Sequence, residues 1–424
     1  MATILISLLL ILLVMGFPIF IATAIPGFVA IKLYMPYIPD MIFAQRMTGS
    51  VSMFTLLAIP FFIFAAEIMS QGQIGQRLID LCEALVGHIR GGLAITTIFA
   101  CLIFGAISGA GVAGIVSIGK IVYPSLIKTG YGKKFSLGLV ISSSTLAMLI
   151  PPGISMVLYS ILANSSVGEI FLSGISVGVL LGITFAIYSY IYAKKKNIQF
   201  KERANFSEIK EKIKKATWAL GMPVILLGGI YLGFYTPTEA AAVSVVYAAF
   251  VEIFIYKDLS FKQFIEVCRN SARITAMIMI LIAAGSLLAW AVTVGQISQS
   301  VVNLIHGWSP FFVIIFINVI FLIAGMFIDP NSAMIILVPL VFPIAIALDI
   351  NLIQLGIIIV LNMAIGMLSP PFGLNLFVGR AIFKEPFEEI IPGVLPFIIL
   401  TLFVLGLISF IPAISLWLPN LLLL

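Results

Sequence analysis

Long uncharged runs of apolar residues recur along the whole chain and constrain its fold more than any other feature. Residues 170–193 contain no charged side chain, and neither do residues 393–418. A helix of about 20 apolar residues crosses the ~30 Å hydrocarbon core of a bilayer. Of the 424 residues, 62% are hydrophobic and only 9% are charged, too few charges to cover a water-soluble surface. The sequence therefore predicts an all-α integral membrane protein with about ten to twelve crossings or half-crossings.

The positive charge of the chain is concentrated in one segment. Residues 194–215 contain nine Lys and Arg residues against three Glu residues, an excess that equals the net charge of +6 of the whole chain. A basic cluster beside apolar spans is typical of a cytoplasmic loop. Because no nucleic-acid-binding motif accompanies it, we expect no nucleic-acid partner. We interpret residues 194–215 as a basic cytoplasmic linker between a first half, residues 1–193, and a second half, residues 216–424.

Three segments outside the linker also have a predicted structure. Residues 4–31 are expected to form a first transmembrane helix, because they lack the positive n-region of a signal peptide. Residues 72–92 and 257–273 combine apolar and charged side chains at helical spacing. This spacing predicts two amphipathic helices that lie at the membrane surface. Surface loops are the alternative interpretation of both segments.

The two halves repeat the same pattern of proline residues. Pro124 precedes the pair Pro151–Pro152 by 27 residues, and Pro343 precedes the pair Pro370–Pro371 by the same 27. Two halves with corresponding broken hydrophobic segments are typical of inverted-repeat transporters, whose binding site lies where the repeats meet. The repeat therefore predicts a transporter.

Each Pro–Pro pair is expected to break a transmembrane helix. Proline has no N–H to donate and its ring clashes with the preceding turn, so carbonyl groups one turn earlier lose their partners. Such backbone inside a membrane must be buried in protein or must line a cavity. Carbonyl oxygens can replace the hydration shell of a cation, which predicts sodium sites near Pro151–Pro152 and Pro370–Pro371. Proline kinks that serve only packing are the alternative.

A candidate helical hairpin precedes each break. Its turn lies at Ser108 in the first half, after Gly105, and at Asp329 in the second half, after Gly325. The N-termini of half-helices present free N–H groups, which attract an anion such as a carboxylate. Asp329 has two interpretations. An acid inside a membrane span is a functional candidate, and Asp before Pro is also a helix start signal.

Two motifs that resemble enzyme motifs are rejected. Residues 114–120 are similar to a phosphate-binding loop, but Ile121 replaces its required Ser or Thr. Ser108–Gly109 is similar to an intramembrane protease motif, yet the two histidines lie in surface-type segments and no base for the serine is evident. We therefore expect no enzyme activity, with an intramembrane hydrolase as the alternative class. Arg380, after the second break, is expected either to attract an anion or to extend to the membrane interface.

Several motifs in the same order resemble the large membrane subunit of tripartite ATP-independent periplasmic (TRAP) transporters. The resemblance covers essentially the whole chain and rests on residues 57–62 (LAIPFF), Ser108–Gly109, Gly130–Tyr131, 150–152 (IPP), 236–241 (TPTEAA) and 369–373 (SPPFG). It implies an all-α, inverted-repeat elevator fold with two re-entrant hairpins and two broken helices. It also implies a multi-pass protein of the bacterial inner membrane that works with a small four-helix membrane subunit and a periplasmic substrate-binding protein.

The function implied by the resemblance is sodium-coupled import of an organic acid, of the sialic acid or C4-dicarboxylate class. A sodium/dicarboxylate symporter that works without a binding protein is the alternative. The resemblance implies about two sodium sites, one comprising Gly105, Ser108, Ala147, Ile150 and Pro152, and the other Gly325, Gly366, Ser369 and Phe372. Its candidate substrate residues are Ser108, Gly153, Asp329, Asn331 and Arg380.

This chain departs from the family pattern at three positions, two of them expected site residues and one at the first hairpin turn. Relatives commonly have Ser where this chain has Ala110 and Gly153, and they often have Gly where it has Ala147. The two missing hydroxyl groups remove side-chain ligands. Ligation at these positions is therefore expected to depend on backbone carbonyl oxygens.

Overall fold

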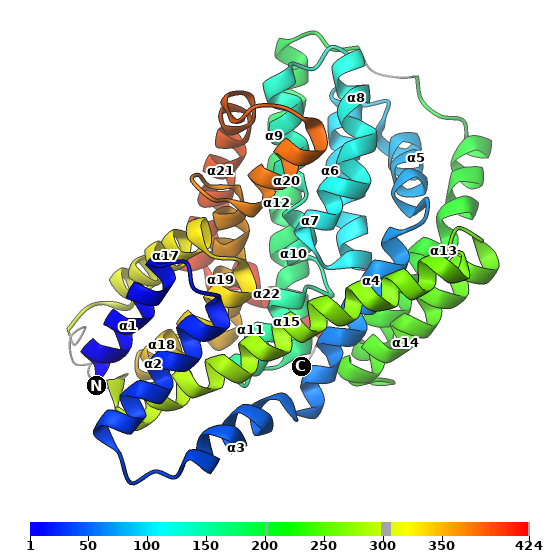
Figure 1. The fold of residues 1–424 in the computed structure, drawn as a ribbon. Helices are drawn as coiled ribbons and strands as arrows, with labels where there is room; N and C mark the ends of the chain where they lie inside the picture. Colours follow the sequence, from blue (N-terminus) through cyan, green and yellow to red (C-terminus); the bar gives the residue numbers. More distant parts are fainter. Residues whose placement is uncertain (200–201, 298–306, 423–424) are drawn as a thin grey trace.

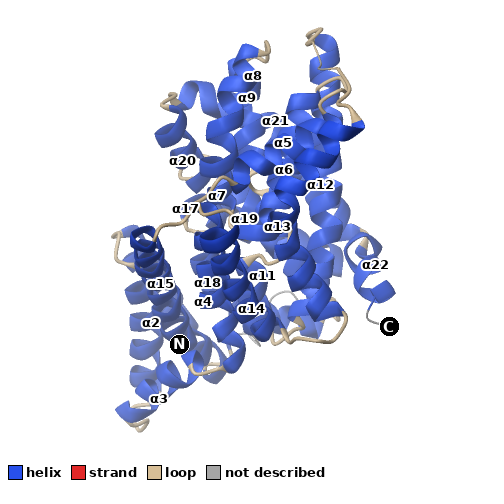
Figure 2. Cartoon of the chain, turned by 90° about the vertical axis from the view of Figure 1, so that its right-hand side faces the viewer, coloured by secondary structure: helices blue, strands red, loops and turns tan. Residues whose placement is uncertain are grey.

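A computed structural model describes residues 1–199, 202–297 and 307–422 of the chain, and every regular element in these ranges is a helix (Figures 1 and 2). A helix satisfies its backbone N–H and C=O groups internally, which is what a segment in lipid requires. Phe200 and Lys201 of the predicted linker lie outside the described residues.

The first half begins with five helices and a short 3-10 segment, η1. They are α1 (Ala2–Val14), α2 (Ile19–Tyr34), α3 (Asp40–Val51), η1 (Phe54–Leu57), α4 (Ala58–Ser70) and α5 (Ile74–Val86). The first hairpin follows, in which α6 (Gly92–Ser108) turns back into α7 (Gly111–Gly114), the π-helical segment η2 (Ile115–Gly119) and α8 (Lys120–Lys128). The first broken helix and a long span complete this half: α9 (Lys133–Ser143), α10 (Leu146–Leu149), α11 (Ile154–Leu162) and α12 (Val167–Lys195).

The second half presents a similar order of elements. It begins with α13 (Phe206–Tyr231), α14 (Pro237–Phe250), the π-helical segment η3 (Val251–Ile255) and α15 (Phe261–Val294). The second hairpin consists of α17 (Pro310–Phe327) and α18 (Pro330–Ala347). The second broken helix and the C-terminal helices are α19 (Leu352–Leu368), α20 (Leu374–Phe383), α21 (Phe387–Phe410) and α22 (Pro412–Leu422).

Many of these helices are suited to a membrane. Among the described residues, eight helices are long and apolar enough to cross one, or up to ten if each bent pair counts as one span. The bent pairs are Asp40–Val51 with Phe54–Ser70, at 55°, and Lys133–Leu149 with Ile154–Leu162, at 43°. The prediction of an all-α membrane protein is confirmed.

The N-terminus differs from the prediction. A single transmembrane helix over residues 4–31 was expected, but the chain forms the two shorter helices α1 and α2, which pack against each other. The reason is local. Gly16 takes a left-handed conformation with φ +75°, which L side chains rarely adopt. Pro18 then precedes the first turn of α2, where its fixed φ is compatible with a helix start.

The two predicted amphipathic segments are both helical, but only the first forms a helix of its own. Residues 72–92 contain α5, whose buried face includes Ile74 and Leu78, so the predicted helix is confirmed. Residues 257–273 do not form a separate helix, because α15 continues without interruption to Val294. Ser260 caps its start, and no proline follows before Val294 to end it. The predicted helix is therefore confirmed over residues 261–273, as the first part of a longer helix, and the position of both segments at the membrane surface stays a prediction.

The basic linker is shorter than its sequence indicated. Helix α12 continues to Lys195, and α13 begins at Phe206. Asn205 and Glu208 form a capping box that starts α13 within the charged segment. Most of the basic residues therefore belong to helix ends rather than to a loop.

The two broken helices run in opposite directions. In Figures 1 and 2 the path from α9 through α10 to α11 descends, whereas the path from α19 to α20 ascends. Helix α11 packs against α18 of the second hairpin, and α20 packs against α7 and η2 of the first. The half-helix after each break thus lies beside the hairpin of the other half, as expected where two inverted repeats meet. The residue boundaries of the two repeats stay a prediction.

Candidate functional site

The first break is buried in the protein. Helix α10 ends at Leu149, the backbone is extended at Ile150 and Gly153, and α11 begins at Ile154. Ile150, Pro151, Pro152 and Gly153 are all buried. The break predicted from the proline pair is therefore confirmed, and its peptide groups lie inside the molecule, as backbone in a membrane must.

The second break has the same form but is more open. Helix α19 ends at Leu368, Ser369 is extended, and Gly373 precedes α20. One additional residue, Phe372, separates the proline pair from this glycine, and its side chain is 58% exposed. The Pro–Pro peptide bond is cis in both breaks.

The tip of each hairpin contacts the break of its own half. At the first tip Gly109 is left-handed, with φ +59°, and the carbonyl oxygen of Pro152 occupies the position that a Cβ atom would need. Only glycine fits both requirements. At the second tip the rings of Phe327 and Phe372 lie 5.9 Å apart. Each tip and its break therefore form one compact unit.

Close backbone packing continues along both hairpins. A Cβ atom built on Gly105 would lie 2.5 Å from Cα of Ala147, and one built on Gly366 would lie 2.5 Å from Cα of Gly325. The hairpin and the broken helix touch through their backbones in both halves. The structure thus brings Gly105 to Ala147 and Gly325 to Gly366, as the two predicted sodium sites require.

Ser108 lies at the first hairpin tip with an unused hydroxyl group. It is the last residue of α6, its side chain is 3% exposed, and its Oγ atom has no hydrogen-bond partner among the described residues. A buried hydroxyl without a partner costs free energy. Ser108 therefore fits the role of an oxygen ligand for a bound molecule or cation.

Asp329 starts α18 at the second hairpin tip. Its Oδ1 atom accepts hydrogen bonds from the backbone N–H groups of Asn331 and Ser332, each 3.1 Å long. The helix-start interpretation is therefore confirmed as a structural role. Oδ1 of Asn331 in turn accepts a 3.2 Å hydrogen bond from the hydroxyl of Ser155, two residues after Gly153. This contact joins the second hairpin to the first break.

A second polar contact crosses between the halves. Nδ2 of Asn375, just after the second break, donates a 3.2 Å hydrogen bond to Oγ of Ser144, just before the first. Both residues are fully buried, and Oδ1 of Asn375 has no partner within the described chain. Ser155 and Asn375 are each the second residue of the half-helix after a break. Neither residue was predicted from the sequence as part of the site. Their shared position, just after a break at a proline pair, could have indicated both.

A chain of three polar side chains lies beside the close contact between Gly325 and Gly366. Nδ2 of Asn362 donates a 2.7 Å hydrogen bond to Oδ1 of Asn318, and Nδ2 of Asn318 donates a 3.0 Å bond to Oγ of Ser409. The three residues lie on α19, α17 and α21. The chain of bonds fastens the first arm of the second hairpin to the broken helix. These asparagines were also not predicted.

Arg380 differs from the other predicted substrate residues. Its side chain lies in an exposed position near the end of α20, and the guanidinium group stands 4.7 Å from the centre of the Phe387 ring. None of its described contacts reaches the hairpin tips. Its role in substrate binding stays a prediction.

The residues near the breaks fit a sodium ion. Sodium is bound through oxygen atoms, and carbonyl groups can replace its water shell. The first break offers extended backbone and the unpartnered hydroxyl of Ser108. The second offers the extended Ser369, whose hydroxyl donates to the carbonyl of Ile365 and keeps its own oxygen available as an acceptor.

The fold resembles that of a solved transporter. A crystal structure of the YdaH transporter of Alcanivorax borkumensis superposes with a TM-score of 0.65, covering 89% of this chain and 87% of that one, at 14% sequence identity. At this identity the likeness concerns the fold alone. It supports the all-α architecture described above.

Comparison of the sequence gives the family. Three curated relatives are TRAP transporter large permease proteins. A C4-dicarboxylate protein of Pseudomonas aeruginosa is 43% identical, with 87% of this chain and 86% of that protein covered. An ectoine protein of Halomonas elongata is 37% identical with 99% of both covered, and a sialic acid protein of Vibrio cholerae is 34% identical with 89% of both covered. These relatives are transporter permeases, not enzymes. The model of the tripartite ATP-independent periplasmic transporter DctM component matches residues 6–414, and the chain belongs to this family.

Proposed function

We propose that this chain imports an organic acid together with sodium, by an elevator movement of the hairpins and broken helices. As a DctM component, it is a large permease subunit in the bacterial inner membrane. The partners of such a subunit are a small membrane subunit and a substrate-binding protein. In our proposal the former has four helices and the latter delivers the acid from the periplasm.

The substrate class is proposed from the relatives and from the chemistry of the site. The named substrates of the three relatives are C4-dicarboxylates, ectoine and sialic acid, and each carries a carboxylate. The C4-dicarboxylate protein is 43% identical to this chain and the sialic acid protein is 34% identical. This difference favours a C4-dicarboxylate as the substrate. Half-helix N-termini beside a break can receive a carboxylate through free N–H groups.

The proposed substrate position lies between the hairpin tips. Ser108 and Gly153 lie together where the first hairpin tip meets its break, since a Cβ atom on Gly109 would stand 3.4 Å from Cα of Gly153. The bond from Ser155 to Asn331 joins the second hairpin tip to this break. Asp329 contributes by fixing the start of α18 rather than by touching the acid, because its carboxylate would repel an anion. Asn331 offers its side-chain amide as a hydrogen-bond donor.

Two sodium positions are proposed at the close backbone contacts. The first comprises oxygens of Gly105, Ser108, Ala147, Ile150 and Pro152, and the second those of Gly325, Gly366, Ser369 and Phe372. Bound sodium would supply positive charge beside the substrate carboxylate. The residues themselves hold the hairpin and the broken helix together in each half, and burial of the first break keeps water from its peptide groups.

The observation that carries this proposal is the pair of broken helices that run in opposite directions, each in backbone contact with a hairpin. The test is uptake of radiolabelled succinate into proteoliposomes that contain this chain and the small subunit, with the binding protein outside. We expect accumulation only with an inward sodium gradient. Equal uptake with potassium in place of sodium would overturn the coupling, and equal uptake without the binding protein would favour the simpler symporter.

A further inference from the structure

The first turn of α5 lies between the first hairpin and the second half of the chain. On one side, a Cβ atom built on Gly75 would lie 3.2 Å from the carbonyl oxygen of Ser117 in η2. On the other side, the backbone N–H of Gln73 donates a 3.2 Å hydrogen bond to Oδ2 of Asp258, between η3 and α15. A displacement of the first hairpin must therefore act on this turn.

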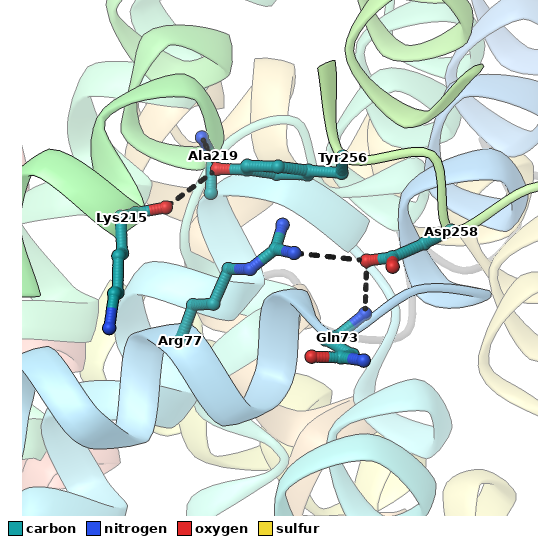
Figure 3. Close-up of polar contacts among 6 residues, drawn as sticks. All are labelled: Gln73, Arg77, Lys215, Ala219, Tyr256 and Asp258. Atoms are coloured by element: carbon teal, nitrogen blue, oxygen red, sulfur yellow. Dashed lines mark hydrogen bonds and ion pairs between the residues drawn. The ribbon is translucent and has the colours of Figure 1, made fainter. Parts of the chain in front are cut away.

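We call the contact between the start of α5 and the residues around Asp258 the junction. Arg77 on α5 provides its positive charge (Figure 3). Its Nη2 atom lies 3.2 Å from Oδ2 of Asp258, and the two side chains are only 19% and 15% exposed. The guanidinium group also stacks on the ring of Tyr256, 3.4 Å from its centre. A largely buried ion pair of this kind is costly to break unless another partner is available.

Tyr256 is held in place by α13 (Figure 3). Its hydroxyl accepts a 3.1 Å hydrogen bond from the backbone N–H of Ala219 and donates a 3.0 Å bond to the carbonyl of Lys215. The ring is thus a fixed, flat surface on which a guanidinium group can shift sideways while it keeps its cation–π contact.

A second carboxylate, that of Glu252, lies in the same junction. Glu252 on η3 is 0% exposed, and neither of its oxygens has a hydrogen-bond partner in the described ranges. Gly72 borders both carboxylates, because a Cβ atom there would contact Oε2 of Glu252 and Oδ2 of Asp258. The Nη1 atom of Arg77 is likewise buried without a partner. The junction therefore holds two carboxylates for one guanidinium group.

We propose that Glu252 is a positioning residue, and that Arg77 transfers from Asp258 to Glu252 when the first hairpin moves relative to α13, α14 and α15. Each carboxylate would then hold α5 in one of two positions, with Tyr256 as the surface between them. The inference rests on the proposed elevator movement. A discrete change of partner gives the hairpin two defined end positions rather than a continuous range.

Substitution of one carboxylate should favour one end position. With Glu252→Gln the guanidinium group keeps Asp258 as its charged partner, and with Asp258→Asn it keeps only Glu252. We expect each variant to lower the maximal rate of sodium-driven succinate uptake about fivefold, the size of a coupling energy near 1 kcal/mol, with unchanged KM. The matched control is Glu266→Gln on α15, an exposed residue whose only described ion pair is 3.9 Å long, and it should retain the wild-type rate.

The triple variant Arg77→Gln, Glu252→Gln and Asp258→Asn separates positioning from a merely structural role. It removes the charge and both partners, so neither end position is favoured, and its maximal rate should exceed that of each single variant. Loss of rate in parallel with loss of thermal stability in all variants would overturn the proposal. So would a wild-type rate for Glu252→Gln.

A distance measurement tests the junction without transport. Spin labels at Gln76→Cys and Lys262→Cys, two exposed positions on α5 and α15, would be placed in a chain whose three native cysteines are replaced by alanine. We expect two distances in the wild-type junction and a single one in each of Glu252→Gln and Asp258→Asn, differing between them. One unchanged distance in all three would overturn the inference, even if sodium-coupled uptake were observed.

Discussion

Gly366 lies against Gly325 so closely that a Cβ atom on Gly366 would stand 2.5 Å from the Cα atom of Gly325. Real Cβ atoms essentially never come this near to backbone. The first half shows the same relationship between Gly105 and Ala147. In each half, the contact brings a hairpin arm against a broken helix at an equivalent place. The residues in contact are among those whose oxygens are proposed to bind sodium.

Gly366→Ala is therefore predicted to separate the second hairpin from its broken helix. Forced contact between backbones costs about 1–3 kcal/mol, and we expect lower thermal stability in detergent together with loss of succinate uptake. Gly406→Ala on α21 is the matched control, because nothing lies within 4 Å of a Cβ atom there. Normal uptake by Gly366→Ala would show that the close contact has no function.

Asp329 is predicted to act as a helix cap. Asn caps helices about as well as Asp, whereas Ala does not, so Asp329→Asn should keep both stability and uptake close to wild type. Asp329→Ala should lose about 1 kcal/mol of stability, because the N–H groups of Asn331 and Ser332 lose their acceptor. Thermal unfolding and uptake of both variants provide the measurement. A selective loss of uptake in Asp329→Asn would assign the carboxylate to substrate or cation binding.

Local chemistry explains which parts of the site were predictable. Proline lacks an N–H group wherever it occurs, so the breaks at Pro151–Pro152 and Pro370–Pro371 followed from the sequence alone. The cap at Asp329 depends on the next three residues and was predicted as one of two roles. Both features arise within one turn of helix.

Other features of the fold depend on contacts between distant residues. The bond from Asn375 to Ser144 joins residues 231 positions apart, and the ion pair between Arg77 and Asp258 joins residues 181 apart. Hydrophobic periodicity carries no signal for such pairs. The N-terminal helices show another limit, because hydropathy alone could not reveal that Gly16 ends a helix inside an apolar run.

Ser108→Ala is predicted to increase stability and to weaken transport. The hydroxyl is buried without a partner in the described chain, so its removal from the sodium-free protein should gain about 1 kcal/mol. If Ser108 ligates sodium, the sodium concentration for half-maximal uptake should rise about tenfold, equivalent to 1.4 kcal/mol. Melting curves without sodium and uptake titrations with sodium measure the two effects.

The control for this prediction is Ser189→Ala on α12. Ser189 is also fully buried, and its hydroxyl has no described partner, so the gain in stability should be similar. Its sodium dependence should stay unchanged. Equal sodium dependence in Ser108→Ala and wild type would exclude the Ser108 hydroxyl as a sodium ligand.

Asn362→Leu is predicted to loosen the second hairpin from α19. The change leaves Oδ1 of Asn318 without its 2.7 Å donor, and a buried acceptor without a partner costs about 1–3 kcal/mol. Uptake should fall as well, because Asn362 lies beside the contact between Gly325 and Gly366 that is proposed to bind sodium, with its backbone oxygen 3.8 Å from the Cβ position of Gly325. The double variant Asn318→Leu, Asn362→Leu removes both groups, so its loss of thermal stability should be smaller than the sum of the two single losses. Additive losses would mean that the two side chains act independently, and the bond between them would then not be what holds the hairpin to the broken helix.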